Sequence, residues 1–346
     1  MTKVLLTGGS GFIAAHVLET LLQRGHSVVT TVRSQAKADK IHEAHPHIAK
    51  DRLETVIVPD IAVEGAFDEV VKTPGLEAVL HTASPFHFNT TNPKKDLIDP
   101  AVLGTTGILK AISRSAPSVK RVVITSSFAA ILDRTKTNDP GTTYTEASWN
   151  PVAIDEVEND AVNAYRASKT LAEKAAWDYL SSASPNFDLV TVNPPMVFGP
   201  VVHYLATLDA INTSNQRFVA LVQGAWKKQE QEGKGIPDSG FGLWIDVRDV
   251  ALAHVLAMEK PELSGKRLFT AAGWIVNRET LDIVRKNFPE LKDQLPSEEA
   301  EGGAAPPEDK RFKFDNSATA KALGFEWTKA EKTTVDTVKS LIPFLN

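Results

Sequence analysis

The chain has no cysteine among its 346 residues. Disulfide bonds, a catalytic thiolate and cysteine-ligated zinc are therefore excluded, and the chain gains nothing from an oxidising compartment. No metal-ligand spacing accompanies its histidines, of which His87 stands in a loop between two expected elements. We therefore expect no metal ion.

Long apolar runs and an excess of one charge sign are also lacking. No apolar stretch approaches the ~18 residues of a membrane-spanning helix. Charged residues make up 23% of the chain and the formal net charge is -5, which argues against broad binding to nucleic acid or to a membrane surface. The first expected strand begins almost at once and leaves no room for a signal peptide. We expect a cytoplasmic protein, a monomer or homodimer, with a small-molecule partner.

Short β-branched or apolar runs alternate with helical stretches, which predicts an α/β fold with a doubly wound parallel sheet of the Rossmann type. The expected strands are residues 4–6, 27–32, 53–58, 77–81, 119–124, 187–192 and 267–271. The length favours more than one compact unit. We expect a cofactor domain over residues 1–198, to which residues 243–273 return through a segment at 243–250. The smaller C-terminal substrate-binding domain would consist of residues 199–242 and 274–346.

The strongest local signal is a strand, a glycine turn and a helix within residues 3–24. Gly8 and Gly11 match the dinucleotide-binding fingerprint, and Ala14 occupies its third, small-residue place. The unpaired amides and the dipole at a helix N-terminus attract an anion such as a pyrophosphate. A glycine turn by itself also occurs as a plain tight loop, so the rest of the chain has to decide.

The ends of the next two expected strands concern the cofactor's adenosine. Arg33 closes the second strand, where an NAD enzyme has Asp or Glu, and an arginine suits the 2′-phosphate of NADPH. Arg33, backed by Lys37, therefore favours NADPH, although both could be ordinary solvated charges. Asp60, at the end of the third strand, is placed either to touch an adenine amino group or to cap the next helix.

Two further strand ends carry candidate binding groups. Residues 82–84 end the fourth strand and lead to Phe86 and Phe88, which suggest a pocket wall or a locally packed loop. Residues 125–127 end the fifth strand in three hydroxyl side chains. Hydroxyls at such places serve either chemistry or turn formation.

Tyr165 and Lys169 stand four residues apart in an expected helix and so lie on one face of it. A phenol with a pKa near 10 is a poor proton donor at neutral pH, and a nearby ammonium stabilises the phenolate. Across ~4 Å at an effective dielectric constant of ~20 the attraction is about 4 kcal/mol, enough to lower the pKa by up to ~3 units. The same spacing also arises by chance, as a solvated lysine beside a half-buried tyrosine.

With the glycine turn, Ser127, Tyr165 and Lys169 in this order, the chain resembles the extended short-chain dehydrogenases/reductases over nearly its whole length. Three segments are similar to the dihydroflavonol-reductase-like branch: residues 81–86, 121–127 and 165–169. Two more resemble, within that branch, the yeast NADPH-dependent methylglyoxal reductases, also known as carbonyl or isovaleraldehyde reductases: residues 113–121 and 244–251.

This resemblance implies a role for each matching residue. Ser127 would hydrogen-bond the carbonyl oxygen, Tyr165 would donate the proton, and Lys169 would bind the nicotinamide ribose and lower the tyrosine pKa. Arg33 and Lys37 would hold the 2′-phosphate. The other expected cofactor contacts are Gly8, Gly9, Ser10, Gly11, Phe12, Ile13, Asp60, Ile61, Thr82, Ala83, Ser84, Pro194, Val197 and Ser214. The expected substrate pocket consists of Phe86, Phe128, Val162 and Met196.

The function so implied is the reduction of aldehydes, ketones and methylglyoxal-like dicarbonyls to alcohols by NADPH. Many extended members have an asparagine where this chain has Ala101, which puts a proton relay through that asparagine in doubt. Arg33 argues against one alternative, an NAD-dependent nucleotide-sugar epimerase or dehydratase. The presence of Ser127, Tyr165 and Lys169 argues against the other, a catalytically silent NADP(H)-sensing protein.

Overall fold

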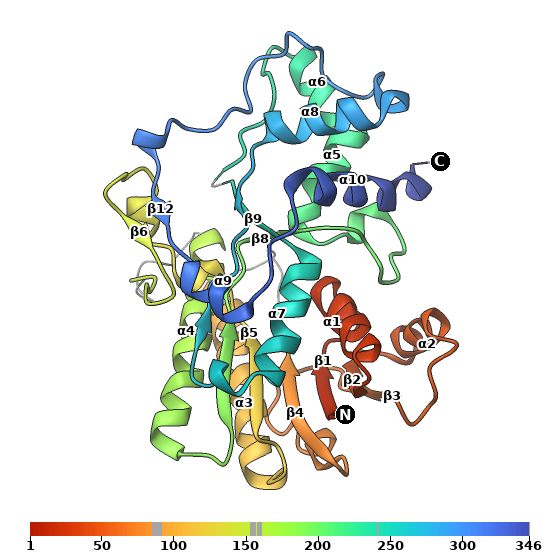
Figure 1. Cartoon of the computed structure of the whole chain (residues 1–346), viewed down its shortest axis with the longest axis vertical. Coiled ribbons are helices and arrows are strands. Elements are labelled where there is room, and N and C mark those ends of the chain that lie inside the picture. The colour runs from red at the N-terminus through yellow and green to blue at the C-terminus, as the bar shows by residue number, and fades with distance from the viewer. Residues whose placement is uncertain (85–91, 153–156, 158–160, 241, 346) are drawn as a thin grey trace.

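A seven-stranded sheet, with every strand pair parallel, lies at the centre of the computed structural model (Figure 1). The structure describes residues 1–84, 92–152, 157, 161–240 and 242–345. The strands follow the order β10-β7-β5-β4-β1-β2-β3, so the direction of winding reverses between β1 and β4. Their bounds are β1 Lys3–Thr7, β2 Ser27–Val32, β3 Leu53–Ile57, β4 Leu76–His81, β5 Arg121–Thr125, β7 Asp188–Val192 and β10 Arg267–Leu268. This confirms the predicted Rossmann-type α/β fold.

Helices cover both faces of this sheet (Figure 1). The helices α1, α2 and α7 contribute to one core and α3 and α4 to the core on the opposite face. Because both faces are covered, the central strands read as continuous apolar runs, and Val4, Leu5 and Leu6 are all fully buried. The helices span α1 Phe12–Gln23, α2 Gln35–Ala44, α3 Asp99–Ser115, α4 Ala161–Ala183 and α7 Val247–Glu259.

A third core lies beyond the carboxyl ends of the central strands, where α5, α6, α8 and α10 surround a three-stranded sheet (Figure 1). Its largest buried side chains include Phe198, Phe218 and Trp244. Open α/β sheets bind their ligands at the carboxyl ends of their strands, so this core stands over the expected site. The elements are β8 Met196–Phe198, β9 Leu243–Asp246, β11 Gly273–Trp274, α5 Gln216–Val222, α6 Ala225–Gln231, α8 Asn277–Asn287 and α10 Ala330–Leu341.

The expectation that residues 243–250 return to the main sheet is wrong. The free edge of β7 is already paired by β10, where Thr191 lies opposite Arg267, so β9 instead joins β8 and β11. The helix α7 starts at once after β9, because the Asp246 carboxylate accepts a hydrogen bond from the Arg248 amide at 2.7 Å and caps it. Within residues 243–273 the main sheet therefore gains only the strand β10, while α7 and Ile245 of β9 contribute to one of its cores.

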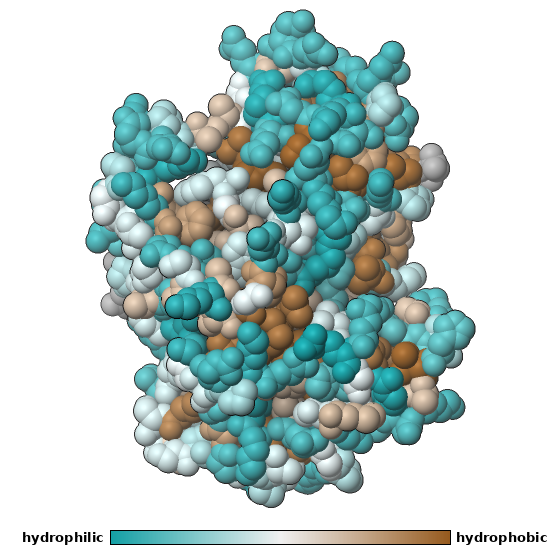
Figure 2. All heavy atoms as spheres, viewed as in Figure 1, coloured by the Kyte–Doolittle hydropathy of each residue, from teal (hydrophilic) through white to brown (hydrophobic). Residues whose placement is uncertain are grey.

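The remaining elements pack beside the segments that follow β5 and β10, where Tyr144 and Phe312 share a core with Phe128 and Phe269. The strands β6 (Thr143–Tyr144) and β12 (Lys313–Phe314) pair with each other, and α9 spans Ser317–Leu323. On the face seen in Figure 2, hydrophilic residues cover most of the surface and hydrophobic ones gather in separate small areas. Within the described residues, no helix combines the length and the apolar character that crossing a membrane requires.

Candidate active site

The turn after β1 brings backbone amides to the carboxyl edge of the sheet. Gly8 has a φ of 77°, a conformation that favours glycine, and the amides of Gly8 and Gly9 both donate to the Thr31 carbonyl at 3.0 Å. A Cβ on Gly9 would stand 2.1 Å from the Thr30 hydroxyl oxygen. The helix α1 then begins at Phe12, so the amides of its first turn have no partner within the helix. This is a backbone site suited to an anion.

A cleft of about 260 Å³ opens on one side of this turn. Arg33, directly after β2, and Lys37, in the first turn of α2, both line it with exposed side chains. The same cleft includes most of the predicted adenosine-side contacts, which are Gly8, Ser10, Gly11, Ile61, Thr82, Ala83 and Ser84. Two cations therefore stand together beside the anion site of the glycine turn.

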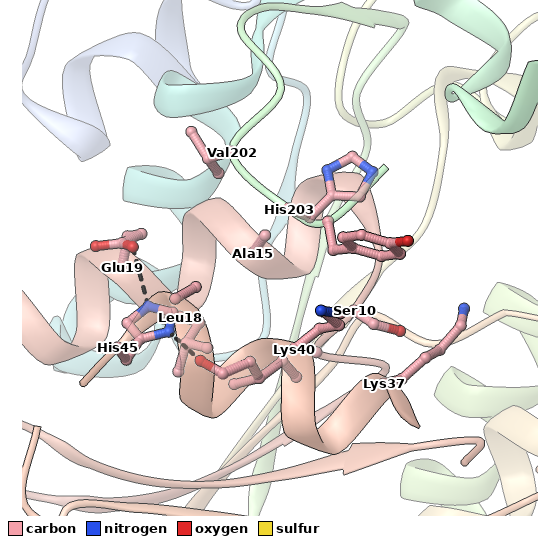
Figure 3. A pocket seen from close by; sticks show the side chains of 13 residues that line it. Ser10, Ala15, Leu18, Glu19, Lys37, Lys40, His45, Val202 and His203 are labelled. Atoms are coloured by element: carbon pink, nitrogen blue, oxygen red, sulfur yellow. Dashed lines mark hydrogen bonds and ion pairs between the residues drawn. The ribbon is translucent and has the colours of Figure 1, made fainter. Parts of the chain in front are cut away.

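Behind this cleft, a smaller cavity of about 60 Å³ lies between α1, α2 and residues 202–204 (Figure 3). His45 and Glu19 form an ion pair across it at 2.9 Å, and the Lys40 ammonium lies 5.1 Å from the centre of the Tyr204 ring. Lys37 belongs to the walls of both cavities. The contacts behind α2 thus hold this helix, and Lys37 with it, against the glycine turn.

A larger cleft, with a volume of about 670 Å³, lies on the other side of the turn. Ser127 reaches it from the end of β5, and Tyr165 and Lys169 reach it from one face of α4. The other predicted residues that line it are Gly8, Gly11, Phe12, Ile13, Thr82, Phe128, Val162, Pro194, Met196, Val197 and Ser214. The fold therefore brings together groups that are far apart in the sequence.

Within this cleft the Ser127 and Tyr165 side chains lie close enough to interact. The Ser127 hydroxyl oxygen also accepts from the Ala129 amide at 3.0 Å, because Ser127 caps a short helical turn. The Lys169 ammonium donates to the Ser84 hydroxyl at 2.9 Å and lies 5.9 Å from the centre of the Tyr165 ring. Two hydroxyls and one ammonium are thus held beside each other at the carboxyl edge of the sheet.

The electrostatics of these groups differ from the expectation. Burial raises the pKa of Tyr165 above its ordinary value, and only the hydrogen bond from Ser127, which favours the phenolate, acts in the other direction. Burial also lowers the pKa of Lys169 to about 8. The predicted lowering of the Tyr165 pKa is therefore wrong for the protein by itself, because the loss of hydration outweighs every attraction to the phenolate.

Two of the predicted residues line neither of the two larger clefts. Asp60 is exposed and lies outside both clefts. Its carboxylate accepts from the Ala62 amide at 2.8 Å within a turn, and the next helical turn is Val70–Lys72, so Asp60 does not cap it. Gly9 borders only the small cavity behind the cleft. Phe86 lies outside the described residues.

Sequence reasoning missed part of the wall of the large cleft. Ile211, Asn212 and Thr213 line it next to Ser214, and Leu132 and Leu243 complete it. The Asn212 amide donates to the Val197 carbonyl at 3.5 Å, which attaches this segment to β8. Composition gives no signal for these positions, since the alternation of elements weakens after residue 200.

Comparisons with known proteins agree with this site. The family model described as NAD dependent epimerase/dehydratase family matches residues 4–271. The chain is 44% identical over 344 residues to "Ketoreductase azaE" of Aspergillus niger, covering 98% of this chain and 97% of the relative. It is 40% identical over 347 residues to "NADPH-dependent methylglyoxal reductase GRE2" of Saccharomyces cerevisiae, covering 99% and 98%.

Solved structures give the same result. The crystal structure of yeast methylglyoxal/isovaleraldehyde reductase Gre2 complexed with NADPH matches with a TM-score of 0.89 and 37% identity over 99% of both chains. A Gre2 structure from Candida albicans, also in complex with NADPH, matches with a TM-score of 0.87 and 34% identity over the full length of both. The relation to yeast methylglyoxal reductases that the sequence predicts is thereby confirmed, and the chain belongs to the NAD-dependent epimerase/dehydratase family.

Proposed function

We propose that this protein is an NADPH-dependent carbonyl reductase that converts aldehydes, ketones and methylglyoxal-like dicarbonyls to alcohols. The observation that carries the proposal is that Ser127, Tyr165 and the Lys169 ammonium line one cleft together with the glycine turn. Relatives that cover almost the whole chain bear the names of a ketoreductase and of NADPH-dependent methylglyoxal reductases.

The residues of the chain fit NADPH. The anion site of the glycine turn leaves no space for a Cβ at Gly9, and the two large clefts meet at this turn because both include Gly8, Gly11 and Thr82. Arg33 and Lys37 in the smaller of the two would hold a 2′-phosphate. NAD enzymes have an aspartate or glutamate at the end of this strand, where this chain has Arg33. Val197 and Pro194 would border the nicotinamide, and Lys169 and Ser84 its ribose.

NADPH, when bound, supplies a hydride to the carbonyl carbon. Ser127 and Tyr165 would both present hydroxyls to the carbonyl oxygen, where negative charge develops during the reaction, and so bind the transition state more tightly than the substrate. Tyr165 then donates its proton to that oxygen as general acid, which yields the alcohol. The raised pKa of Tyr165 keeps the phenol protonated before the reaction. The cation at Lys169 would stabilise the phenolate that remains.

The carbonyl substrate would occupy the outer part of the large cleft. Met196 is half-buried there and Val162 is 47% exposed, so both offer apolar surface to a ligand. Phe128 is only 5% exposed and stacks on Phe269 at 5.1 Å between ring centres, so we propose that it shapes the wall from behind. Ile211 and Leu243 add to the apolar lining.

We propose that residues 1–198 with 243–273 bind the cofactor, and that residues 199–242 and 274–346 form a substrate-binding unit. A separate core, to which residues 199–242 and 274–345 contribute most side chains and Phe198 and Trp244 are added, supports this division. A cytoplasmic enzyme that acts as a monomer or homodimer completes the proposal. Size-exclusion chromatography and cell fractionation would test these two points.

The test of the proposed reaction is the loss of NADPH absorbance with a simple diketone and with a panel of aldehydes and ketones. A carbonyl reductase oxidises NADPH and accumulates the alcohol. Tight binding of NADPH without turnover of any carbonyl compound would support the sensing alternative. Conversion of a nucleotide sugar with retained NAD would support the epimerase alternative.

A further inference from the structure

The buried carboxylate of Glu173 lies one helical turn beyond Lys169 and two turns beyond Tyr165 on α4. Its side chain is 1% exposed. One oxygen accepts from Arg267 at 2.6 Å, Thr191 at 3.1 Å and Trp177 at 3.3 Å. The other accepts from the side-chain amide of Asn193 at 2.7 Å and from the Ser126 hydroxyl. Nothing in the proposed reaction uses this group.

Stability does not account for such an arrangement. The charge is compensated by Arg267, whose side chain is 10% exposed, but taking two charges out of water costs several kcal/mol per ion in real proteins. An apolar pair of similar size is often as stable as a buried ion pair or more so. The contacts of the carboxylate therefore need another explanation, and their positions in the fold supply one.

The donors on the second oxygen belong to the two turns that border the catalytic cleft. Ser126 directly precedes Ser127 after β5, and Asn193 directly precedes Pro194 after β7. The side-chain amide of Asn193 also donates to the Ser127 carbonyl at 3.3 Å. The Phe128 amide donates to the Pro194 carbonyl at 2.8 Å. Through Glu173, both turns are bound to the helix that carries Tyr165 and Lys169.

We propose that Glu173 is a positioning residue for the reaction, which holds the Ser127 turn and the Pro194 turn at a fixed place relative to Tyr165. The inference rests on the proposed carbonyl reduction. The active groups stand on three separate segments, and a displacement of about 1 Å between reacting groups can cost about 100-fold in rate. A carboxylate that accepts from two of these segments while it belongs to the third fixes all three at once.

Arg267, which donates to the first oxygen of Glu173, makes further contacts of its own. Arg267 donates to the carbonyls of Glu146 and Ser148 at 2.7 and 2.6 Å and lies 3.7 Å from the centre of the Trp149 ring. These contacts join the short edge strand β10 to the segment after β6. The ion pair itself can therefore be structural, and a test has to separate it from the contacts to Ser126 and Asn193.

Two double variants make this separation, because both remove the ion pair. In Glu173→Gln with Arg267→Met, the amide oxygen can still accept from Ser126 and Asn193. In Glu173→Met with Arg267→Met, no acceptor remains. We expect the first to keep kcat within about threefold of wild type and the second to lose about 100-fold in kcat. The Kd of NADPH, measured by fluorescence titration, should stay within about threefold in both, because the adenosine cleft is untouched.

The variant Ser126→Ala removes one hydrogen bond to the Glu173 carboxylate and replaces no charged residue. It therefore keeps the inference testable if the double methionine variant does not fold. We expect its kcat to fall about tenfold, with KM for NADPH nearly unchanged. The matched control is Asp178→Asn, the same change of acid to amide on an exposed position of α4, which should leave kcat as in wild type.

Equal kcat values in the two double variants, or wild-type kcat in Ser126→Ala, would overturn the positioning role and leave Glu173 a structural ion-pair partner. Thermal melts of each variant show whether a loss of kcat is merely a loss of folded protein. Wild-type protein is assayed first with NADPH and a diketone. Absence of turnover at that stage would overturn the proposed function itself, a result distinct from the failure of the variants.

Discussion

The Lys169 ammonium lies 5.9 Å from the centre of the Tyr165 ring while it donates to Ser84 at 2.9 Å. The cation is thus held by a group from the end of β4 and faces the aromatic side chain, and both residues are half-buried. Burial makes the charge of Lys169 easy to lose and makes the proton of Tyr165 hard to lose. The pKa values of the two residues are therefore shifted in opposite directions, that of Lys169 downward and that of Tyr165 upward.

The first prediction concerns the pH profile of reduction. The pKa of Lys169 is lowered to about 8, so its charge disappears as the pH rises through that value, whereas Tyr165 keeps its proton because its pKa is raised. We expect kcat/KM to fall above a pH of about 8, since this parameter reports the free enzyme. Initial rates between pH 6.5 and 10, with NADPH varied and the carbonyl substrate saturating, give the kcat/KM for NADPH that tests this. A flat profile up to pH 10 would show that the charge of Lys169 does not matter.

The second prediction is that Tyr165→Phe loses turnover and keeps its cofactor. General acid catalysis contributes about 10²–10⁴-fold, so kcat should fall by at least about 100-fold, and the Kd of NADPH should change less than twofold. Tyr179→Phe is the matched control, because its hydroxyl donates to Ser113 at 2.7 Å at the other end of α4. Substantial turnover in purified Tyr165→Phe protein would contradict the proposed proton donor.

The third prediction is that Arg33→Asp shifts the cofactor preference. Hydrogen bonds to a charged group contribute about 1.5–3 kcal/mol, so the ratio of kcat/KM for NADPH to that for NADH should fall about 10- to 100-fold. The control is Lys110→Asp, a charge reversal at an exposed position of α3 on the opposite face of the sheet. An unchanged ratio in Arg33→Asp would remove the guanidinium from the 2′-phosphate site.

The fourth prediction tests the close packing of the glycine turn. A Cβ at Gly9 would meet the hydroxyl oxygen of Thr30 at 2.1 Å, and Thr30 is fully buried and donates to the Leu6 carbonyl. Overpacking of this kind costs about 1–3 kcal/mol, so Gly9→Ala should lower Tm by several degrees and weaken NADPH binding.

The control for the glycine turn is Gly107→Ala in α3, because a Cβ there has no neighbour within 4 Å. It should be neutral or stabilise the protein by up to about 1 kcal/mol. Addition of Thr30→Ala to Gly9→Ala should restore part of the loss. Melting curves and NADPH titrations of the three variants compare the outcomes, and equal Tm values for Gly9→Ala and wild type would contradict the steric argument.

The positions of the strands along the chain and the groups at their carboxyl ends could be predicted because both depend on local patterns. Periodic apolar runs mark the strands, and polar residues that follow them, such as Arg33 and Ser127, meet at one edge of a parallel sheet. The spacing of Tyr165 and Lys169 places them on one face of a helix whatever surrounds it. These features need no knowledge of contacts between distant segments.

Other features depend on distant partners and stayed out of reach. The pKa of Tyr165 follows from its burial, which the sequence does not display. The pairing of β9 depends on the occupied edge of β7. The proposed role of Glu173 depends on donors from three distant segments: Ser126, the pair Thr191 and Asn193, and Arg267. A helix pattern predicts that Glu173 shares a face with Lys169, but not what it binds.

The third core has a consequence for how the protein is made. It combines Ile211, which also lines the catalytic cleft, with Val338 and Leu341 of α10. Domains fold as units while the ribosome still adds residues, so the dinucleotide half can assemble early on the nascent chain. The part of the cleft wall that contains Ile211 can be completed only after residue 341 has left the exit tunnel. Ribosome-bound chains stopped before α10 should therefore capture the coenzyme yet remain without reductase activity.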